Sequence, residues 1–212
     1  MQRLRVIHTK EGDLKYISHL DLMRLWERAL RRAGIPLSYS KGYNPRPRLS
    51  SAAPLPLGFT SSHELLDIFL SRRVSIGYFL KAVKANLPEG IDVLDVDEVW
   101  VGLPSLQSLV RFCEYMVGVI FDEDELKERV YDFLSKKEFF WEYLRERERR
   151  RYDLRKFVGD IWLRGREGGL TILSMRLRHD EKGAGRPDHV LYALGIDDFE
   201  FIHRTRIILE ER

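Results

Sequence analysis

The chain has 212 residues, of which 44% are hydrophobic and 33% charged, so it can bury a real core and has the composition of a soluble globular protein. A net charge of +3 does not by itself predict nucleic-acid binding, and a single cysteine excludes an internal disulfide and an iron–sulfur cluster held by this chain alone. No apolar run approaches the length of a membrane span, and the N-terminal residues lack the apolar core of a signal peptide, so we expect a cytoplasmic protein.

The first predicted elements are a strand and a well-delimited helix. Residues 3–7 alternate charged and apolar side chains, as a half-buried strand does. Ser18 and Asp21 have the spacing of a capping box at the start of a helix. Gly34 suits the position after the helix, and Pro36 prevents continuation. The sequence therefore predicts a helix between Ser18 and Gly34.

The next segment, residues 38–58, is called the arm. It contains no acidic residue, four prolines and four serines. Pro45 and Pro47 fix their own φ angles and push the preceding residues toward extended conformations, so the arm cannot be helical. We expect a rigid, basic segment between two regular elements. The alternative is an ordered loop whose cations are only solvated.

The pattern after the arm completes a first domain. Residues 63–70 have the branched and aromatic content of a strand, residues 75–86 form an amphipathic helix, and residues 91–101 are extended with a predicted bulge near 97–98. If the arm supplies the strand after the first helix, the order is βαββαβ. Residues 1–103 are therefore predicted to be a ferredoxin-like domain that carries the arm.

A second, divergent copy of the same order is predicted over residues 104–212. The expected elements are a strand at 109–121, a helix at 123–136, a hairpin over 139–164, a strand at 170–179, a short helix at 186–195 and a strand at 201–209. The predicted fold class is thus α+β, with two ferredoxin-like domains in tandem.

His19 is the one residue with a possible catalytic role. It stands at the first helical position, where the helix dipole disfavours a charged imidazole and favours a bound anion. A neutral His19 could act as a base or a donor near a phosphate, or it could simply pack between the helix and a strand. A metal site from His8, His19 and His63 is conceivable, but no spacing demands it, so neither a metal nor a cofactor is predicted.

The arm carries the residues expected to bind nucleic acid. Arginine forks pair with phosphates, tyrosines stack on bases, and asparagine reads base edges. Prolines that hold the backbone reduce the entropy lost on binding. The predicted RNA-binding residues are Lys41, Tyr43, Asn44, Arg46 and Arg48.

The chain has SHLD at the start of the first predicted helix, ALRRAG at its end, and YSKGYNPRPRLS followed by LPLG in the arm. Later stretches are RYDLRKFV, GRPDHVL and HRTRI. These motifs resemble a bacterial family of unknown function, the radical SAM-linked proteins, and the resemblance is strong over residues 3–98. Members of the family are fused to, or encoded beside, a cobalamin-binding-type radical SAM enzyme. The resemblance implies such an enzyme as partner, and an RNA-related or ribosome-linked role.

A weaker resemblance is architectural. Paired ferredoxin-like domains with a histidine near the first helix look like the CRISPR repeat-processing endoribonucleases, and Gly165, Gly168 and Gly169 would stand in for their glycine-rich loop. No motif match accompanies this likeness.

Three functions follow from these observations. The first is an RNA-binding accessory protein of a radical SAM enzyme, without catalytic activity of its own. The second is a metal-independent endoribonuclease with His19 as the general base. The third is a protein-interaction module whose arm docks on the partner enzyme.

Overall fold

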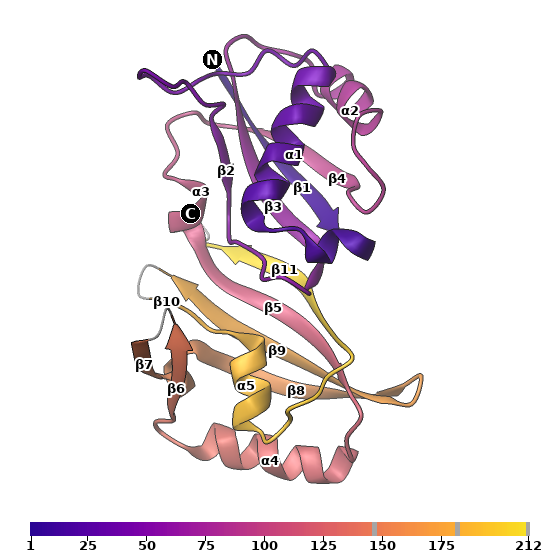
Figure 1. Cartoon of the computed structure of the whole chain (residues 1–212), viewed down its shortest axis with the longest axis vertical. Coiled ribbons are helices and arrows are strands. Elements are labelled where there is room, and N and C mark those ends of the chain that lie inside the picture. Colours follow the sequence, from indigo (N-terminus) through magenta and orange to yellow (C-terminus); the bar gives the residue numbers. More distant parts are fainter. Residues whose placement is uncertain (146–147, 181–182, 211–212) are drawn as a thin grey trace. The chain divides into compact units, whose positions relative to one another are not determined.

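The computed structural model describes residues 1–145, 148–180 and 183–210 (Figure 1). The chain divides into two compact units, Met1–Val110 and Arg111–Arg212, and each is described by itself. The sequence predicts that the first domain ends near residue 103, and this boundary stays a prediction. Among the described residues, no helix is long and apolar enough to cross a membrane.

The first unit is a four-stranded antiparallel sheet with two main helices. Its elements in chain order are β1 (Gln2–Lys10), η1 (Gly12–Tyr16), α1 (His19–Arg32), β2 (Leu49–Ser51), β3 (Thr60–Leu70), α2 (Ile76–Lys84), β4 (Val93–Val99) and the short α3 (Leu106–Leu109). The strands lie in the order β2–β3–β1–β4, and all three pairings are antiparallel. This is the ferredoxin-like βαββαβ arrangement, with the arm supplying β2 as predicted.

The core of the first unit lies between one face of this sheet and its helices. In β1, Leu4 and Val6 alternate with Arg3 and Arg5, so the aliphatic side chains share the face that α1 covers. Trp26 of α1 is completely buried in this core. Further members of the core are Leu22, Leu30, Leu66, Ile68, Leu70, Phe79, Val83 and Val96.

The predicted ends of α1 are confirmed. The Ser18 hydroxyl oxygen accepts a hydrogen bond from the Asp21 amide at 3.1 Å, which satisfies a backbone donor that the first turn leaves without a helical partner. Gly34 follows the helix with a φ of 67°, a left-handed conformation that glycine adopts without strain.

The opposite face of the first sheet holds a buried ionic cluster. Asp67 is fully buried and accepts hydrogen bonds from Arg3 Nε at 2.9 Å and Arg5 Nε at 2.8 Å. Arg3 also donates to the carbonyls of Leu103 at 2.8 Å and Pro104 at 2.9 Å. This cluster therefore fixes the segment after β4 against β1 and β3.

The second unit repeats the same order with an insertion. Its elements are β5 (Val110–Val119), α4 (Glu123–Ser135), β6 (Phe140–Arg145), β7 (Glu148–Asp153), η2 (Leu154–Phe157), β8 (Val158–Glu167), β9 (Leu170–Asp180), β10 (Gly183–Ala184), α5 (Pro187–Ala193) and β11 (Phe201–Leu209). The main strands lie in the order β8–β9–β5–β11, and the short β10 also pairs with β9. The β6–β7 hairpin is the insertion, so the α+β class with two ferredoxin-like units is confirmed.

Two local predictions were wrong. The bulge in β4 is not at 97–98, because Asp97 and Glu98 pair regularly with β1; the irregularity lies between Ile7 and His8, opposite Val93–Asp95. Consecutive polar residues near the end of β4 reflect its place at the sheet edge, where polar residues face water.

The predicted hairpin over 139–164 is also interrupted. Asp153 Oδ1 accepts hydrogen bonds from the amides of Phe139 at 2.9 Å and Arg155 at 3.2 Å, which ends β7 and starts η2. The strand after η2, β8, then pairs with β9 in the main sheet of this unit. Residues 146–147 of the predicted hairpin lie outside the described residues.

Candidate functional site

The first half of the arm folds into a small hairpin. Tyr39 pairs with Pro47 in an antiparallel bridge, and the amide of Ser40 donates to the carbonyl of Arg46 at 2.8 Å. The Ser40 hydroxyl in turn accepts from the Arg46 amide at 3.0 Å. Pro47 has no backbone N–H. It can take part in this pairing because it lies at the edge of the hairpin, where no backbone donor is needed from it.

Backbone hydrogen bonds fix the base of the hairpin to β3. The amide of Ser38 donates to the carbonyl of Phe69 at 2.8 Å, and the amide of Phe69 donates to the carbonyl of Arg48 at 3.1 Å. The Arg48 amide donates across the hairpin to Ser38 at 2.8 Å. The rigidity predicted for the arm therefore comes from pairing with the sheet as well as from proline.

The hairpin separates the five predicted RNA-binding residues into a tip and a base. Lys41, Tyr43, Asn44 and Arg46 are exposed at the tip, and the Tyr43 side chain is 99% exposed. Gly42 has a φ of 136°, which a residue with a side chain rarely adopts. The structure thus brings four of the five residues together at the hairpin tip.

Arg48 lies at the base instead. Its guanidinium is 4.2 Å from the centroid of the Phe69 ring, and its Nη1 lies 3.6 Å from the Met1 sulfur. A pocket of about 400 Å³ adjoins it, lined by Arg3, Arg48, Leu49, Ser50, Phe69 and Leu103. Arg48 is therefore positioned to hold the arm on the sheet.

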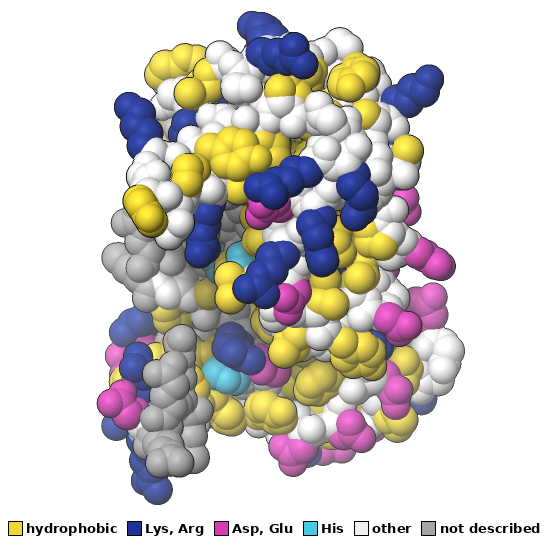
Figure 2. All heavy atoms as spheres, turned by 45° about the horizontal axis from the view of Figure 1, so that its top comes forward, with side chains coloured by type: hydrophobic (Ala, Val, Ile, Leu, Met, Phe, Trp, Pro, Cys, Tyr) yellow, Lys and Arg dark blue, Asp and Glu magenta, His cyan; other side chains and the backbone are white. Residues whose placement is uncertain are grey.

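A stripe of arginines on α1 adjoins the arm. Arg24, Arg28, Arg31 and Arg32 are exposed. Arg28 follows Arg24 by four residues, and Arg31 and Arg32 follow Arg28 by three and four, so all four lie along one side of the helix. Figure 2 shows basic side chains gathered on the face of the molecule turned toward the viewer. Two of the four are paired within α1, since Arg24 contacts Asp21 at 3.0 Å and Arg31 contacts Glu27 at 2.8 Å.

His19 is at the opposite end of α1 from the hairpin of the arm, whereas the last residue of the arm, Gly58, donates its amide to the Lys15 carbonyl at 2.8 Å, close to the start of α1. Because α1 has 14 residues and a helix rises 1.5 Å per residue, its ends are about 20 Å apart. His19 is the first helical residue, as predicted, and is half-buried. The arm follows the last turn, so the structure does not bring Arg46 or Arg48 back toward His19.

The three histidines considered for a metal site do not form one. The His8 ring is buried against Trp26, with ring centroids 4.9 Å apart, and its Nδ1 lies 2.8 Å from the Thr9 carbonyl oxygen. Among the described residues, no group of three or more histidine, cysteine, aspartate or glutamate side chains is arranged to hold a metal ion.

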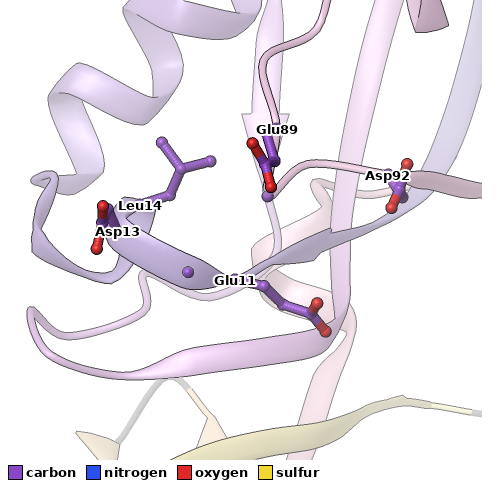
Figure 3. A pocket seen from close by; sticks show the side chains of 7 residues that line it. Glu11, Asp13, Leu14, Glu89 and Asp92 are labelled. Atoms are coloured by element: carbon purple, nitrogen blue, oxygen red, sulfur yellow. The ribbon is translucent and has the colours of Figure 1, made fainter.

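An acidic pocket lies where η1 meets the loop before β4. It has a volume of about 540 Å³, and its carboxylates belong to Glu11, Asp13, Glu89 and Asp92. Figure 3 shows that these carboxylates are spread around the pocket and do not converge on one point. Because η1 leads into the start of α1, His19 stands at the end of this unit that carries the acidic pocket, and the hairpin of the arm follows the opposite end of α1.

The second unit contains an aromatic pocket that was not predicted from the sequence. Its volume is about 240 Å³, and the rings of Tyr143, Tyr152 and Phe157 line it together with His189. The Tyr152 hydroxyl lies 2.9 Å from His189 Nδ1. The alternation of Trp141 and Tyr143 in one strand was a signal that aromatic side chains share a face, but nothing in the sequence placed His189 beside them.

Burial shifts the pKa of both hydrogen-bonded groups toward their neutral forms. It raises the pKa of Tyr152, and the nearby Asp188 carboxylate acts in the same direction. Burial also lowers the pKa of His189, an effect that Asp188 opposes and Arg186 reinforces. The hydrogen-bonded pair in the pocket is therefore a neutral phenol and a neutral imidazole at pH 7.

Comparison with solved structures shows the fold in larger proteins. A chain of a Cbf5–Nop10–Gar1 complex matches with a TM-score of 0.53 and 13% identity, over 96% of this chain and 48% of that one. A chain of an archaeal box H/ACA sRNP Nop10–Cbf5 complex matches with a TM-score of 0.49 and 11% identity, over 96% and 47%. This chain thus spans about half the length of the chains it matches.

The chain of the Cbf5–Nop10–Gar1 complex is not a CRISPR nuclease, so the architectural likeness to CRISPR repeat-processing endoribonucleases gains no support from this match. At these identities the similarity establishes the fold alone.

The sequence comparisons place the chain in a family without a known activity. The search of curated proteins found no match. Residues 3–187 match the model of the family described as "Uncharacterized protein conserved in bacteria (DUF2344)". The chain therefore belongs to this bacterial family of uncharacterized proteins.

Proposed function

We propose that this protein binds single-stranded RNA through the tip of the arm and presents it to a partner enzyme. The observation that carries the proposal is the Tyr43 side chain, which is 99% exposed on a hairpin that also presents Lys41 and Arg46. A fully exposed ring on an ordered hairpin offers a base a surface on which to stack. The neighbouring cations match the phosphates on either side of that base.

The order of the hairpin favours binding. The two backbone hydrogen bonds between Ser38–Ser40 and Arg46–Arg48 hold the tip in one conformation before RNA arrives. Less conformational entropy is then lost on binding than with a disordered basic loop. The absence of acidic residues over 38–58 removes local repulsion of phosphates.

Charge on the rest of the first unit indicates where a bound RNA strand would lie. The exposed arginines of α1 continue the basic surface from the arm along the helix. The acidic pocket with Glu11, Asp13 and Glu89 lies where the helix begins. We therefore expect RNA to lie over the hairpin of the arm and the last turns of α1, and to avoid the end near His19.

We also propose a radical SAM enzyme as the partner. The support is the resemblance of residues 3–98 to the radical SAM-linked proteins. The buried Cys113 is the only cysteine of the chain, and one thiolate cannot hold an iron–sulfur cluster, so such chemistry would belong to the partner.

The RNA proposal is tested by fluorescence anisotropy with a short labelled single-stranded RNA over a range of salt concentrations. Tyr43→Ala should lose about 1–3 kcal/mol of binding free energy without changing the salt dependence, because it removes stacking and no charge. Tyr78→Ala, on α2, is the matched control because Tyr78 is also exposed. It should bind as the unmodified protein does.

The charges give a separate readout. Lys41→Ala and Arg46→Ala should each lower the slope of log affinity against log salt by about 0.7, the value for one phosphate contact on a single strand. Lys84→Ala, in the last turn of α2, is the control. Unchanged affinity and slope in all three arm variants would overturn the proposal.

The proposed partner is tested by measuring whether this protein captures a radical SAM enzyme encoded beside it, before and after nuclease treatment. Loss of the complex after nuclease indicates bridging by RNA. A complex that survives nuclease but is lost in the arm variants would instead support the protein-interaction module.

A further inference from the structure

The aromatic pocket of the second unit is built by several elements that are separate in sequence. Tyr143 comes from β6, Tyr152 from β7, Phe157 from η2, Ala184 from β10, and His189 from α5. Elements that converge in this way fix a pocket better than a single loop does. All of these residues belong to the one compact unit that begins at Arg111.

The rings of the pocket hold one another in place. Tyr152 meets Tyr143 edge to face at 5.9 Å and 89°, and meets Phe157 at 5.6 Å and 67°. Behind the pocket, Trp141 stacks on Tyr192 at 6.1 Å and 11° and contacts the His189 ring at 5.5 Å. These are the favourable geometries for aromatic pairs, so the walls are formed before any ligand binds.

The pocket offers hydrogen bonds but little net charge. Arg186 donates to both carboxylate oxygens of Asp188, at 3.0 Å and 2.6 Å, which offsets the one permanent charge at the rim. Tyr152 and His189 share a hydrogen bond, and each keeps the capacity for one further hydrogen bond. A charged ligand is not selected, because Arg186 and Asp188 already neutralise one another at the rim.

Size narrows the ligand further. The volume of about 240 Å³ is smaller than the roughly 300–1,000 Å³ of sites for drug-sized ligands. Flat aromatic walls select a planar ligand, and neutral donors and acceptors select one with polar edges. A single heterocyclic base satisfies both conditions, whereas a dinucleotide exceeds the space.

We propose that this pocket binds an uncharged planar heterocycle of the nucleobase class. The site is distinct from the arm, and its binding of free nucleosides does not depend on the RNA proposal. The base could be a free nucleoside or one base of an RNA strand, since the chemistry of recognition is the same.

The test is saturation-transfer NMR of the full chain with adenosine, guanosine, cytidine and uridine. At least one nucleoside should bind with an affinity on the order of 0.1–1 mM, as expected for a ligand of this size. A trinucleotide distinguishes the two sources: tighter binding than the nucleoside indicates a base within RNA, and weaker binding indicates a free nucleoside.

Two pocket variants and one control make the test specific. Ala184→Leu fills the pocket from an exposed position on β10, and Tyr143→Leu removes one aromatic wall. Both should weaken binding at least about tenfold while the circular dichroism spectrum is kept. Tyr131→Leu, which changes an exposed tyrosine on α4, should bind normally.

The proposal is overturned if no nucleoside binds at millimolar concentration, or if the folded Ala184→Leu variant binds as well as the unmodified protein. Either result leaves the arm experiment unaffected, because that experiment measures the salt dependence of strand binding by variants of the other unit.

Discussion

The guanidinium of Arg48 lies 4.2 Å from the centroid of the Phe69 ring, at the point where the arm joins β3. The backbones of the same two residues are also joined, by the hydrogen bond from the Phe69 amide to the Arg48 carbonyl at 3.1 Å. Arg48 therefore anchors the arm, while Arg46, two residues earlier, is exposed at its tip. The two arginines of the PRPR motif have different surroundings.

We expect Arg48→Ala to destabilise the first unit and Arg46→Ala to leave it unchanged. Loss of the contact between Arg48 and Phe69 should cost about 0.5–1 kcal/mol of unfolding free energy. Urea denaturation followed by circular dichroism measures the difference. Equal destabilisation by the two substitutions would show that the distinction between tip and base is wrong.

The different roles of these arginines could not be predicted from the sequence. The ends of α1 could be, because Ser18 and Gly34 act through contacts within a few residues. The bridge between Tyr39 and Pro47 depends instead on β3, whose edge receives the arm. Local patterns therefore predicted a rigid basic segment but not which of its cations reach solvent.

The aromatic pocket shows the same limit more strongly. Tyr143 and His189 are far apart in sequence, and their rings lie 5.2 Å apart only because β6 and α5 meet in the folded unit. The sequence predicted both of these elements, a hairpin over 139–164 and a short helix at 186–195, from local patterns. Such patterns carry no information about which elements meet.

Asp67→Ala should be the most destabilising of the substitutions considered. Asp67 is fully buried and faces Arg3, which is 1% exposed, and Arg5, which is 15% exposed. Removal of the Asp67 carboxylate leaves the guanidinium groups of Arg3 and Arg5 without their counter-ion in a region shielded from water. We expect a loss of about 3–5 kcal/mol of unfolding free energy. Urea denaturation should show a lower midpoint with an unchanged slope.

A surface ion pair in the same unit is the control. Arg73 contacts Glu98 at 2.7 Å, with the two side chains 73% and 33% exposed. Arg73→Ala should change the unfolding free energy by less than about 1 kcal/mol. Similar losses for Asp67→Ala and Arg73→Ala would contradict the assigned role of the buried cluster.

Stability should fall as the pH drops below the ordinary histidine value of 6.5. Burial lowers the pKa of His189 in the folded protein, and it lowers the pKa of His179 together with the charge of Arg204. Below pH 6.5 the unfolded chain therefore binds protons that the folded chain does not, which favours unfolding. The loss begins near pH 6.5 and continues until the folded-state pKa values are passed.

The contribution of His189 is separated by substitution. His189→Gln should reduce the pH dependence of the unfolding free energy between pH 7 and pH 5, because glutamine does not titrate. His179 should account for a remaining part with the same sign. The prediction fails if the variant and the unmodified protein lose stability equally over this range.

His19→Ala should leave the affinity for RNA unchanged. The imidazole stands at the start of α1, about 20 Å from the end that leads into the hairpin of the arm, and the pocket with Glu11 and Asp13 repels phosphates there. If His19 were instead the base of a metal-independent nuclease, the substitution would abolish cleavage of a structured RNA in EDTA. Cleavage that depends on His19 would replace the accessory role by the enzymatic one. Ser18→Ala is the companion variant, because it removes the cap of α1 at a cost of about 1 kcal/mol and keeps the imidazole. A loss of cleavage in His19→Ala that Ser18→Ala does not reproduce would therefore be chemical rather than structural.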